Sequence, residues 1–326
     1  MSAPAAAGAF IGLLARRGRF LVAEPFFHGA DPEQSNHRRR ASEPLVIASA
    51  QAVAGRSAKP GDLVLLSVSG SARARRGSPG RPQILRVLGS PAVARNLIEA
   101  LMLQRGLRRG FDPAVEHEAR GAHRKAASTG QRRDLRELPT FTIDPVSARD
   151  FDDAISAQSL PDGLVRVWVH IADVSAHVPL GSLLDGEARR RSTSIYVPGA
   201  VEPMLPAALS NEACSLVAGQ DRLAVTVELD FDGARVARSA FYRSLIRSDE
   251  RLDYEQVDRI FTGSRSASEP WGDALVSART VATALEGARR SAVTLDSLEP
   301  EFQFDSEGNV SVSAWGLTYL VLEQLG

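Results

Sequence analysis

Four aspartates within ten residues form the part of this sequence best suited to chemistry. They are Asp144, Asp150, Asp152 and Asp153, in the stretch TIDPVSARDFDDA at residues 142–154. Like charges at short range repel one another, and each carboxylate costs free energy to remove from water. A hard divalent cation such as Mg²⁺ or Mn²⁺ compensates both effects, because it prefers oxygen ligands. The spacing therefore predicts a metal site formed by these carboxylates.

A solvated acidic loop is the alternative interpretation, since most acidic clusters are of that kind. The flanking residues argue against it: residues 141–143 and 154–155 have strand character, and Phe151 separates the carboxylates. Asp150 and Asp152 face the same way in an extended segment, whereas Asp153 faces the opposite way unless the backbone bends. An EF-hand does not fit, because its Gly and its distant Glu are missing.

The stretch at residues 142–154 resembles the signature of the RNB family, the exoribonucleases of the ribonuclease II and ribonuclease R type. Four further blocks resemble family segments in the same order. They are WVHIADVS at 168–175, STSIYVP at 192–198, PMLP at 203–206, and LSN with CSL at 209–216. The resemblance is specific over residues 134–216 and weaker elsewhere.

The resemblance implies a 3′→5′ exoribonuclease that hydrolyses single-stranded RNA to nucleoside 5′-monophosphates with a divalent metal. It makes Asp144 and Asp153 direct metal ligands and Asp150 a further or outer ligand. Asp152 matches the most rate-critical carboxylate, which orients the attacking water or a second metal. Tyr196 matches the tyrosine that stacks on the base at the RNA 3′ end.

The sequence departs from the family pattern at a segment that contributes to catalysis. The later segment of the Thr-Ser-Pro-Ile-Arg-Arg-Tyr type, whose arginine stabilises the transition state, is not found, and neither is a C-terminal RNA-binding barrel. We therefore expect an N-terminal portion of such a ribonuclease. The alternative is a catalytically inactive RNA-binding protein derived from the same family.

The elements that must position these residues suggest an α+β protein of three parts. Residues 1–90 hold five short strand patterns (9–14, 19–23, 44–48, 61–68 and 83–88), as in a small barrel of the oligonucleotide-binding (OB) type. The resembled family carries such cold-shock-like barrels. Residues 91–133 predict a helical linker that begins at Ser90-Pro91. Residues 134–326 would form an RNB catalytic domain of mixed sheet and helices, incomplete at its C-terminal end.

Within the third part, we interpret His170 as a hydrogen-bonded core histidine on a buried strand rather than as a catalyst. A basic last turn supports a short helix before residue 192, and Asp232-Gly233 predicts a hairpin turn. The expected helices and strands are 164–174 (strand), 183–191 (helix), 222–229 and 236–246 (hairpin), 252–261 and 271–290 (helices), 302–305 and 310–314 (hairpin), and a helix from about Gly316.

Charge is distributed unevenly along the chain. Residues 1–136 carry 23 Lys and Arg against 10 Asp and Glu, while residues 137–326 carry 16 against 29. This asymmetry predicts a part that faces a polyanion, here single-stranded RNA, and a part that faces a metal. Residues 38–40 and 73–81 are arginine-rich segments that would contact phosphates or form solvated loops. The predominance of Arg over Lys also fits a GC-rich genome.

Composition limits the location of the protein. No apolar run approaches the roughly 20 residues that a membrane span needs. Cys214 is the single cysteine, which excludes an intramolecular disulfide and fits a reducing cytoplasm. The Ala-rich residues 1–10 lack the basic start of a signal peptide. We expect a cytoplasmic monomer with no membrane partner.

Overall fold

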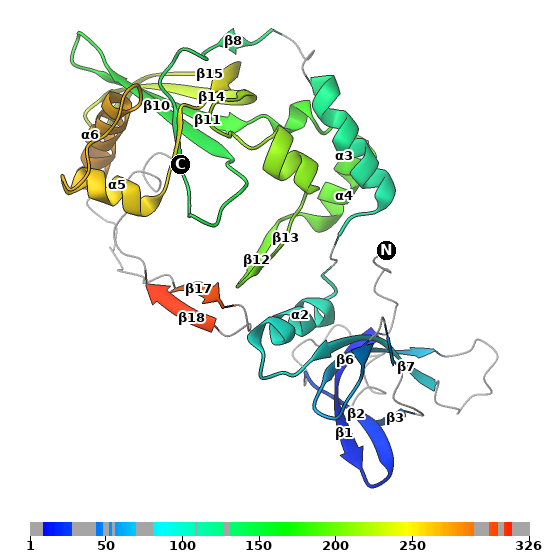
Figure 1. Cartoon of the computed structure of the whole chain (residues 1–326). Helices are drawn as coiled ribbons and strands as arrows, with labels where there is room; N and C mark the ends of the chain where they lie inside the picture. Colours follow the sequence, from blue (N-terminus) through cyan, green and yellow to red (C-terminus); the bar gives the residue numbers. More distant parts are fainter. Residues whose placement is uncertain are drawn as a thin grey trace. The chain divides into compact units, whose positions relative to one another are not determined.

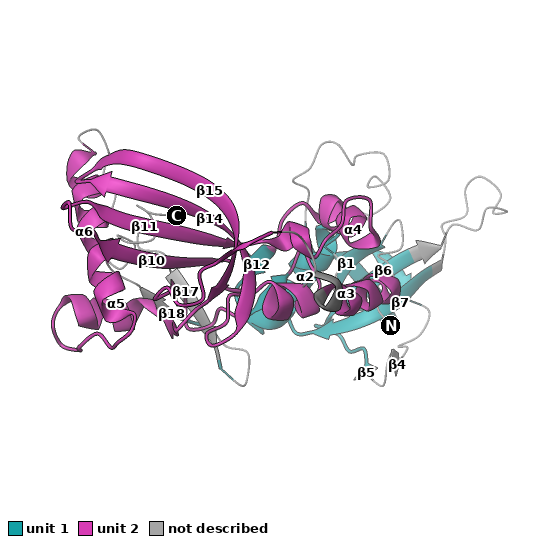
Figure 2. Cartoon of the chain, turned by 90° about the horizontal axis from the view of Figure 1, so that it is seen from above, with its two compact units in different colours: residues 1–110, 195–202, 300–314 teal, residues 111–194, 203–299, 315–326 magenta. Residues whose placement is uncertain are grey.

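The computed structural model of the chain contains two compact units (Figures 1 and 2). The first comprises residues 1–110, 195–202 and 300–314, and the second comprises 111–194, 203–299 and 315–326. The residues that the structure describes are 9–27, 44–47, 52–53, 56–69, 81–107, 110–126, 131–289, 300–305 and 310–314.

The first unit is built on a five-stranded antiparallel sheet. Its strand order is β3-β2-β1-β6-β7. The strands are β1 (Ala9–Arg17), β2 (Phe20–Pro25), β3 (Leu45–Ile47), β6 (Leu63–Ser69) and β7 (Arg81–Gly89). Alternating apolar residues supply its core, among them Leu14, Val64 and Leu66. The five predicted strands are confirmed; closure into an OB-like barrel and the three domain boundaries stay predictions.

Helix α2 (Ala94–Gln104) follows β7, but it begins later than the sequence predicted. Ser90 does not cap it. The Ser90 hydroxyl instead accepts the Ala92 N–H at 3.2 Å, and its carbonyl accepts the Asn96 side-chain amide at 3.0 Å. Residues 91–93 therefore form a turn, and Val93 is the N-cap residue. The arginines of residues 38–40 and 73–80 and the helix expected from Gly316 lie outside the described residues.

Three two-stranded hairpins complete the described strands of the first unit. They are β4 (Ala52–Val53) with β5 (Arg56–Ser57), β12 (Ile195–Val197) with β13 (Ala200–Glu202), and β17 (Pro300–Phe304) with β18 (Val310–Ala314). The last pair confirms the hairpin expected near residues 302–314, with its first strand beginning two residues earlier.

The second unit is built on a seven-stranded mixed sheet of order β16-β9-β10-β11-β14-β15-β8. Most neighbours are antiparallel, but β16 pairs with β9 and β8 pairs with β15 in parallel. The strands are β8 (Arg133–Asp134), β9 (Phe141–Ile143), β10 (Asp153–Ser159), β11 (Val165–Ala172), β14 (Asp221–Asp232), β15 (Arg235–Arg247) and β16 (Glu250–Leu252).

Helices cover both faces of this sheet, so the second unit has two hydrophobic cores. Apolar residues of α5 (Tyr254–Phe261) and α6 (Gly272–Ala288) pack on Phe141, Ile155 and Val167. On the other face, α3 (Pro113–Ala126), α4 (Leu183–Arg191) and the π-helix η3 (Ala208–Ala213) pack on Ala154 and Ala172. Figure 1 shows α5 and α6 on one side of the strands and α3 and α4 on the other.

Local sequence explains several of these elements. The Ser182 hydroxyl accepts the Asp185 N–H and caps α4, whose last turn is basic. Asp253 and Gln256 form a capping box at the start of α5. Gly233 adopts a φ of 58° in the turn between β14 and β15, which a glycine accommodates without strain. No helix of the described residues is long and apolar enough to span a membrane.

A ladder of buried polar side chains crosses the middle of the sheet. His170 Nε2 lies 3.0 Å from Ser156 Oγ, which lies 2.7 Å from Thr140 Oγ1. His170 Nδ1 lies 2.8 Å from Thr226 Oγ1, which lies 2.6 Å from Ser244 Oγ. Burial lowers the pKa of His170 to about 3, so the imidazole is neutral. The interpretation of His170 as a core histidine is confirmed.

A buried ion pair joins the segment before β8 to the end of β11. Arg132 donates to Asp173 at 2.5 Å, and their side chains are 8% and 1% exposed. The same guanidinium donates to the carbonyls of Ala224 and Ser244. The Asp173 carboxylate also accepts the Ser175 hydroxyl, and these bonds hold its pKa below the usual range. One side chain thereby connects three strands.

Candidate metal centre

The four aspartates lie on the loop between β9 and β10, the acidic loop of residues 144–153. Asp144 directly follows β9, is 8% exposed, and donates its backbone N–H to the Leu252 carbonyl at 3.0 Å. Its Oδ2 is buried and has no hydrogen-bond partner among the described residues. Burial raises the pKa of Asp144 to about 6, and the charges of Asp153 and Asp152 add to this effect.

The other three carboxylates stand at the far end of the loop. Asp153 is the first residue of β10, opposite Ile171, and it is half-buried. Burial and the charge of Asp152 raise its pKa. Asp152 is exposed, yet partial loss of solvation and the charge of Asp150 raise its pKa as well. The pKa of each of Asp144, Asp152 and Asp153 is thus raised first by burial and further by the charge of another carboxylate of the loop.

Hydrogen bonds to its main-chain atoms fasten the far end of the loop to the body of the unit. The Ser215 hydroxyl accepts the Phe151 N–H at 3.0 Å and donates to the Arg149 carbonyl at 3.1 Å. The Leu216 N–H donates to the Phe151 carbonyl, and the Ala172 N–H donates to the Asp152 carbonyl, both at 2.8 Å. The loop has no regular secondary structure, but its backbone is held.

Arg251 of β16 spans the near end of the loop. Its guanidinium donates to the Pro145 carbonyl and lies 5.5 Å from the centroid of the Phe151 ring. Its positive charge opposes the rise in the Asp144 pKa. The side chain therefore holds residues 145 and 151 of one loop and brings a cation close to the carboxylates.

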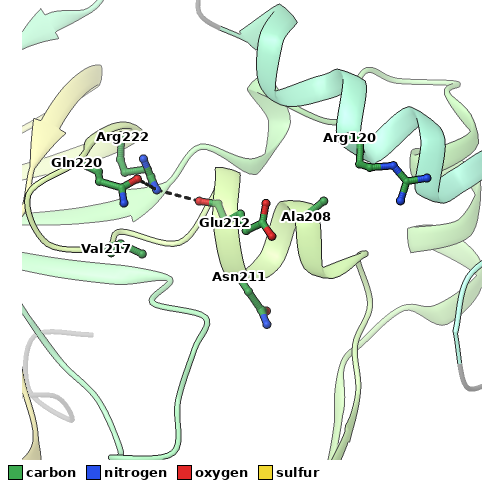
Figure 3. Close-up of a pocket in the computed structure, with 7 residues that line it drawn as sticks. All are labelled: Arg120, Ala208, Asn211, Glu212, Val217, Gln220 and Arg222. Atoms are coloured by element: carbon green, nitrogen blue, oxygen red, sulfur yellow. Dashed lines mark hydrogen bonds between the residues drawn. The ribbon is translucent and has the colours of Figure 1, made fainter.

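A cavity of about 400 Å³ lies beside η3, and its lining includes Arg120, Asn211, Glu212 and Arg222 (Figure 3). Arg222, one of the lining residues, is buried. Its guanidinium donates to the carbonyls of Glu212 (3.0 Å) and Ser215 (2.6 Å) and to the Gln220 side chain. Arg222 thus binds both the last turn of η3, at Glu212, and Ser215, which follows the helix.

The donor chemistry of the acidic loop fits a hard divalent cation. The described residues include no group of three or more His, Cys, Asp or Glu side chains already arranged to hold a metal ion. The unpartnered Oδ2 of Asp144 is, however, a buried acceptor that an ion would satisfy. Carboxylate oxygens are the ligands that Mg²⁺ and Mn²⁺ prefer.

Tyr196 lies in the first unit, on the hairpin of β12 and β13. It is 63% exposed and stands opposite Val201, which is also exposed. An aromatic ring in this setting is suited to stacking. Its role toward RNA stays a prediction.

Two residues that hold the acidic loop were not anticipated from the sequence. Ser215 lies in the CSL block that carried the family resemblance, but no role was assigned to it. Arg251 stands in a three-residue strand without a motif, and only the parallel pairing of β16 with β9 brings it to the loop. Ser215 could have been found among the polar residues of the family blocks, whereas Arg251 lies outside every block.

A model of the RNB domain matches residues 132–314, which include the acidic loop and its anchors. The chain belongs to the RNB family. Its RNB relatives include ribonuclease R of Thermotoga maritima, 44% identical over 185 residues, which are 55% of this chain and 26% of that protein. Ribonuclease R of Escherichia coli is 37% identical over 205 residues, 60% of this chain and 25% of that protein. The chain thus spans about a quarter of these RNB relatives.

Solved structures share the fold. Mycoplasma genitalium RNase R in complex with double-stranded RNA aligns with a TM-score of 0.77 and 24% identity, over 98% of this chain and 55% of that one. Yeast Ssd1, a pseudonuclease, aligns with a TM-score of 0.60 and 16% identity, over 98% of this chain and 39% of that one. The mixed α+β fold with an N-terminal five-stranded sheet therefore matches part of an RNase R structure.

Proposed function

We propose that this RNB protein is a metal-dependent 3′→5′ exoribonuclease that hydrolyses single-stranded RNA to nucleoside 5′-monophosphates. The observation that carries the proposal is the acidic loop. Four carboxylates share a loop whose backbone is bonded to the sheet at both ends, so their positions are constrained although they repel one another. The matched relatives named ribonuclease R support the substrate class.

Each carboxylate has a role that suits its surroundings. Mg²⁺ or Mn²⁺, when bound, supplies a nucleophilic water and neutralises phosphate charge. Asp144 and Asp153 would hold the ion, because burial raises the pKa of both and a cation relieves that cost. Asp150 would serve as a further or outer ligand. Asp152 is exposed, so its carboxylate can accept a hydrogen bond from the attacking water and orient it.

Tyr196 would hold the 3′ end of the strand. Its exposed ring offers a stacking surface for a nucleobase, worth about 1–3 kcal/mol per base. Stacking is tolerant of sequence because every base has a π-face. This supports degradation of many RNA sequences rather than recognition of one.

The test is the shortening of a 5′-labelled single-stranded RNA by this chain in the presence of Mg²⁺. We expect stepwise loss of nucleotides from the 3′ end, loss of activity in Asp152→Asn, and normal activity in the matched control Asp232→Asn. Asp232 is exposed and paired with Arg235 on the β14–β15 hairpin. Unchanged RNA, or equal rates for Asp152→Asn and the parent, would overturn the proposal.

A second candidate is an RNA-binding protein that does not cleave. It is favoured by the excess of basic residues over residues 1–136. The same experiment separates the two candidates. This one predicts that the labelled RNA is retained by the protein and stays at full length with or without Mg²⁺.

A further inference from the structure

We propose that Ser215 is a positioning residue for the metal site, because its hydroxyl fixes the backbone on both sides of Asp150. The inference rests on the proposed metal-dependent function. Ser215 follows Cys214, the C-cap residue of η3, and is 0% exposed. It is 66 residues away in sequence from Arg149, whose carbonyl it binds. It is not a ligand itself, so it would act through the loop.

The direction of both hydrogen bonds is fixed by chemistry. A serine hydroxyl has one proton to donate and lone pairs that accept. The Arg149 carbonyl can only accept and the Phe151 N–H can only donate, so the Ser215 proton points to residue 149. Both capacities of the hydroxyl are used within the acidic loop. Alanine at this position would remove the partner of the Phe151 N–H and of the Arg149 carbonyl, which costs free energy.

The hydrogen bonds of Ser215 fix the backbone atoms from which the carboxylate side chains extend. Arg149 and Phe151 flank Asp150, so the two bonds set the direction in which the Asp150 side chain leaves the backbone. The Phe151 and Asp152 carbonyls are held by the Leu216 and Ala172 N–H groups. Ser215 and its neighbour therefore supply three of these four restraints. Removing the hydroxyl frees the backbone at Asp150 and loosens it before Asp152.

Ser215 is suited to this role because its own backbone is fixed. The Ser215 carbonyl accepts Arg222 Nε at 2.6 Å, and the same guanidinium binds Glu212 and Gln220 (Figure 3). Arg222 itself is buried, with 8% of its surface exposed. The loop is thereby attached to η3 rather than only to its own strands.

The test compares Ser215→Ala with Ser244→Ala. Ser244 is also 0% exposed, and its hydroxyl is bonded to Thr226 and to the Ala224 carbonyl, away from the acidic loop. Both variants lose a buried hydroxyl, so urea unfolding should show similar decreases in their free energies of unfolding. Calorimetry with Mn²⁺ on the whole chain should show affinity about tenfold weaker for Ser215→Ala, the low end of what outer-shell partners contribute. Ser244→Ala should bind Mn²⁺ like the parent.

Ser215→Cys is the second variant if Ser215→Ala fails to fold. It replaces the hydroxyl by a somewhat larger thiol that donates and accepts only weakly, so the Mn²⁺ affinity of this variant should fall between those of Ser215→Ala and the parent. Equal Mn²⁺ affinity of the Ser215 variants and the parent would overturn the inference. An equal loss in Ser244→Ala would also overturn it, because the effect would then be general.

Hydrogen exchange on the metal-free proteins separates the positioning role from the proposed function. Ser215→Ala should exchange faster at the amides of residues 150–153, and Ser244→Ala should not. If the parent binds no Mn²⁺, the proposed metal function fails, and the exchange result still decides whether Ser215 holds the loop. Unchanged exchange in that segment would refute the positioning role.

Discussion

The buried Asp144 carboxylate is ionised at pH 7 in surroundings that disfavour the charge. Its folded-state pKa of about 6 lies above the usual value of 3.8, so the folded state binds the proton more tightly than the unfolded state does. The resulting penalty is present above pH 6 and disappears as the pH falls through 3.8. We expect Asp144→Asn to stabilise the metal-free protein by about 1–2 kcal/mol at pH 7.5 in urea unfolding.

Two controls frame this result. The advantage of Asp144→Asn should shrink toward zero near pH 4, and the exposed Asp232→Asn should show no such trend. Mn²⁺ should stabilise the parent by mass action and leave Asp144→Asn nearly unaffected. A variant that is less stable than the parent at pH 7.5 would show that Asp144 is held by favourable contacts instead.

His170 gives the opposite dependence on pH. Its pKa is lowered to about 3 by burial, so between pH 6.5 and 3 the unfolded state binds more protons, and stability falls as the pH falls. His170→Gln should be less stable than the parent at pH 7.5 by about 1–3 kcal/mol, because it disturbs the polar ladder. The difference should narrow at pH 5. Thermal melts at the two pH values test this, and a constant difference would contradict it.

Among the elements, β11, β14 and β15 are joined through the buried pair of Arg132 and Asp173. Removing one partner leaves the other charge buried, so Arg132→Met should cost about 3–5 kcal/mol. The double variant Arg132→Met/Asp173→Asn should recover part of this loss, because no charge remains unpaired. A double-mutant cycle in urea measures the coupling. If the loss in the free energy of unfolding of the double variant equals the sum of the losses of the two single variants, the two charges do not depend on each other.

Elements with local signals were predictable from the sequence, and those made by distant pairing were not. Helix α4 has the predicted bounds of residues 183–191, because Ser182 and the basic last turn mark its ends. The β14–β15 hairpin followed from Asp232-Gly233. The π-helix η3 and the parallel strand β16 carry no periodic pattern, and both depend on contacts with remote parts of the chain. The predicted start of α2 was wrong, because Ser90 forms its hydrogen bonds within a turn instead of capping the helix.

The same distinction applies to the candidate site. The positions of four carboxylates on one loop followed from their spacing, whereas their burial did not. Asp144 and Asp152 stand eight residues apart, yet one is buried and the other is exposed. Asp144 lies beside β16, to which its backbone N–H is bonded at the Leu252 carbonyl, and its position in sequence does not reveal that pairing. Spacing alone therefore predicted that the four residues share one loop, and not which of them has its pKa raised to about 6.

At the scale of the whole molecule, the uneven charge predicts RNA affinity that depends on salt. About five phosphate contacts would give a slope of roughly −3.5 in log affinity against log salt. Affinity for single-stranded RNA should then fall about a hundredfold from about 50 to about 200 mM salt. Fluorescence anisotropy measures the affinity at each salt concentration. Asp152→Asn is the control, and its slope of log affinity against log salt should equal that of the parent. Equal affinity at the two salt concentrations would contradict an electrostatic binding surface.

The parallel pairing of β16 with β9 has a consequence for protein synthesis. Arg251 contacts Pro145 across 106 residues of sequence. At translation rates of about 5–20 residues per second, the acidic loop emerges roughly 5–20 s before the strand that completes its surroundings. During that interval the nascent chain presents aspartates without Leu252 or Arg251 beside them. The near end of the acidic loop therefore lacks its hydrogen-bond partners until β16 has been made.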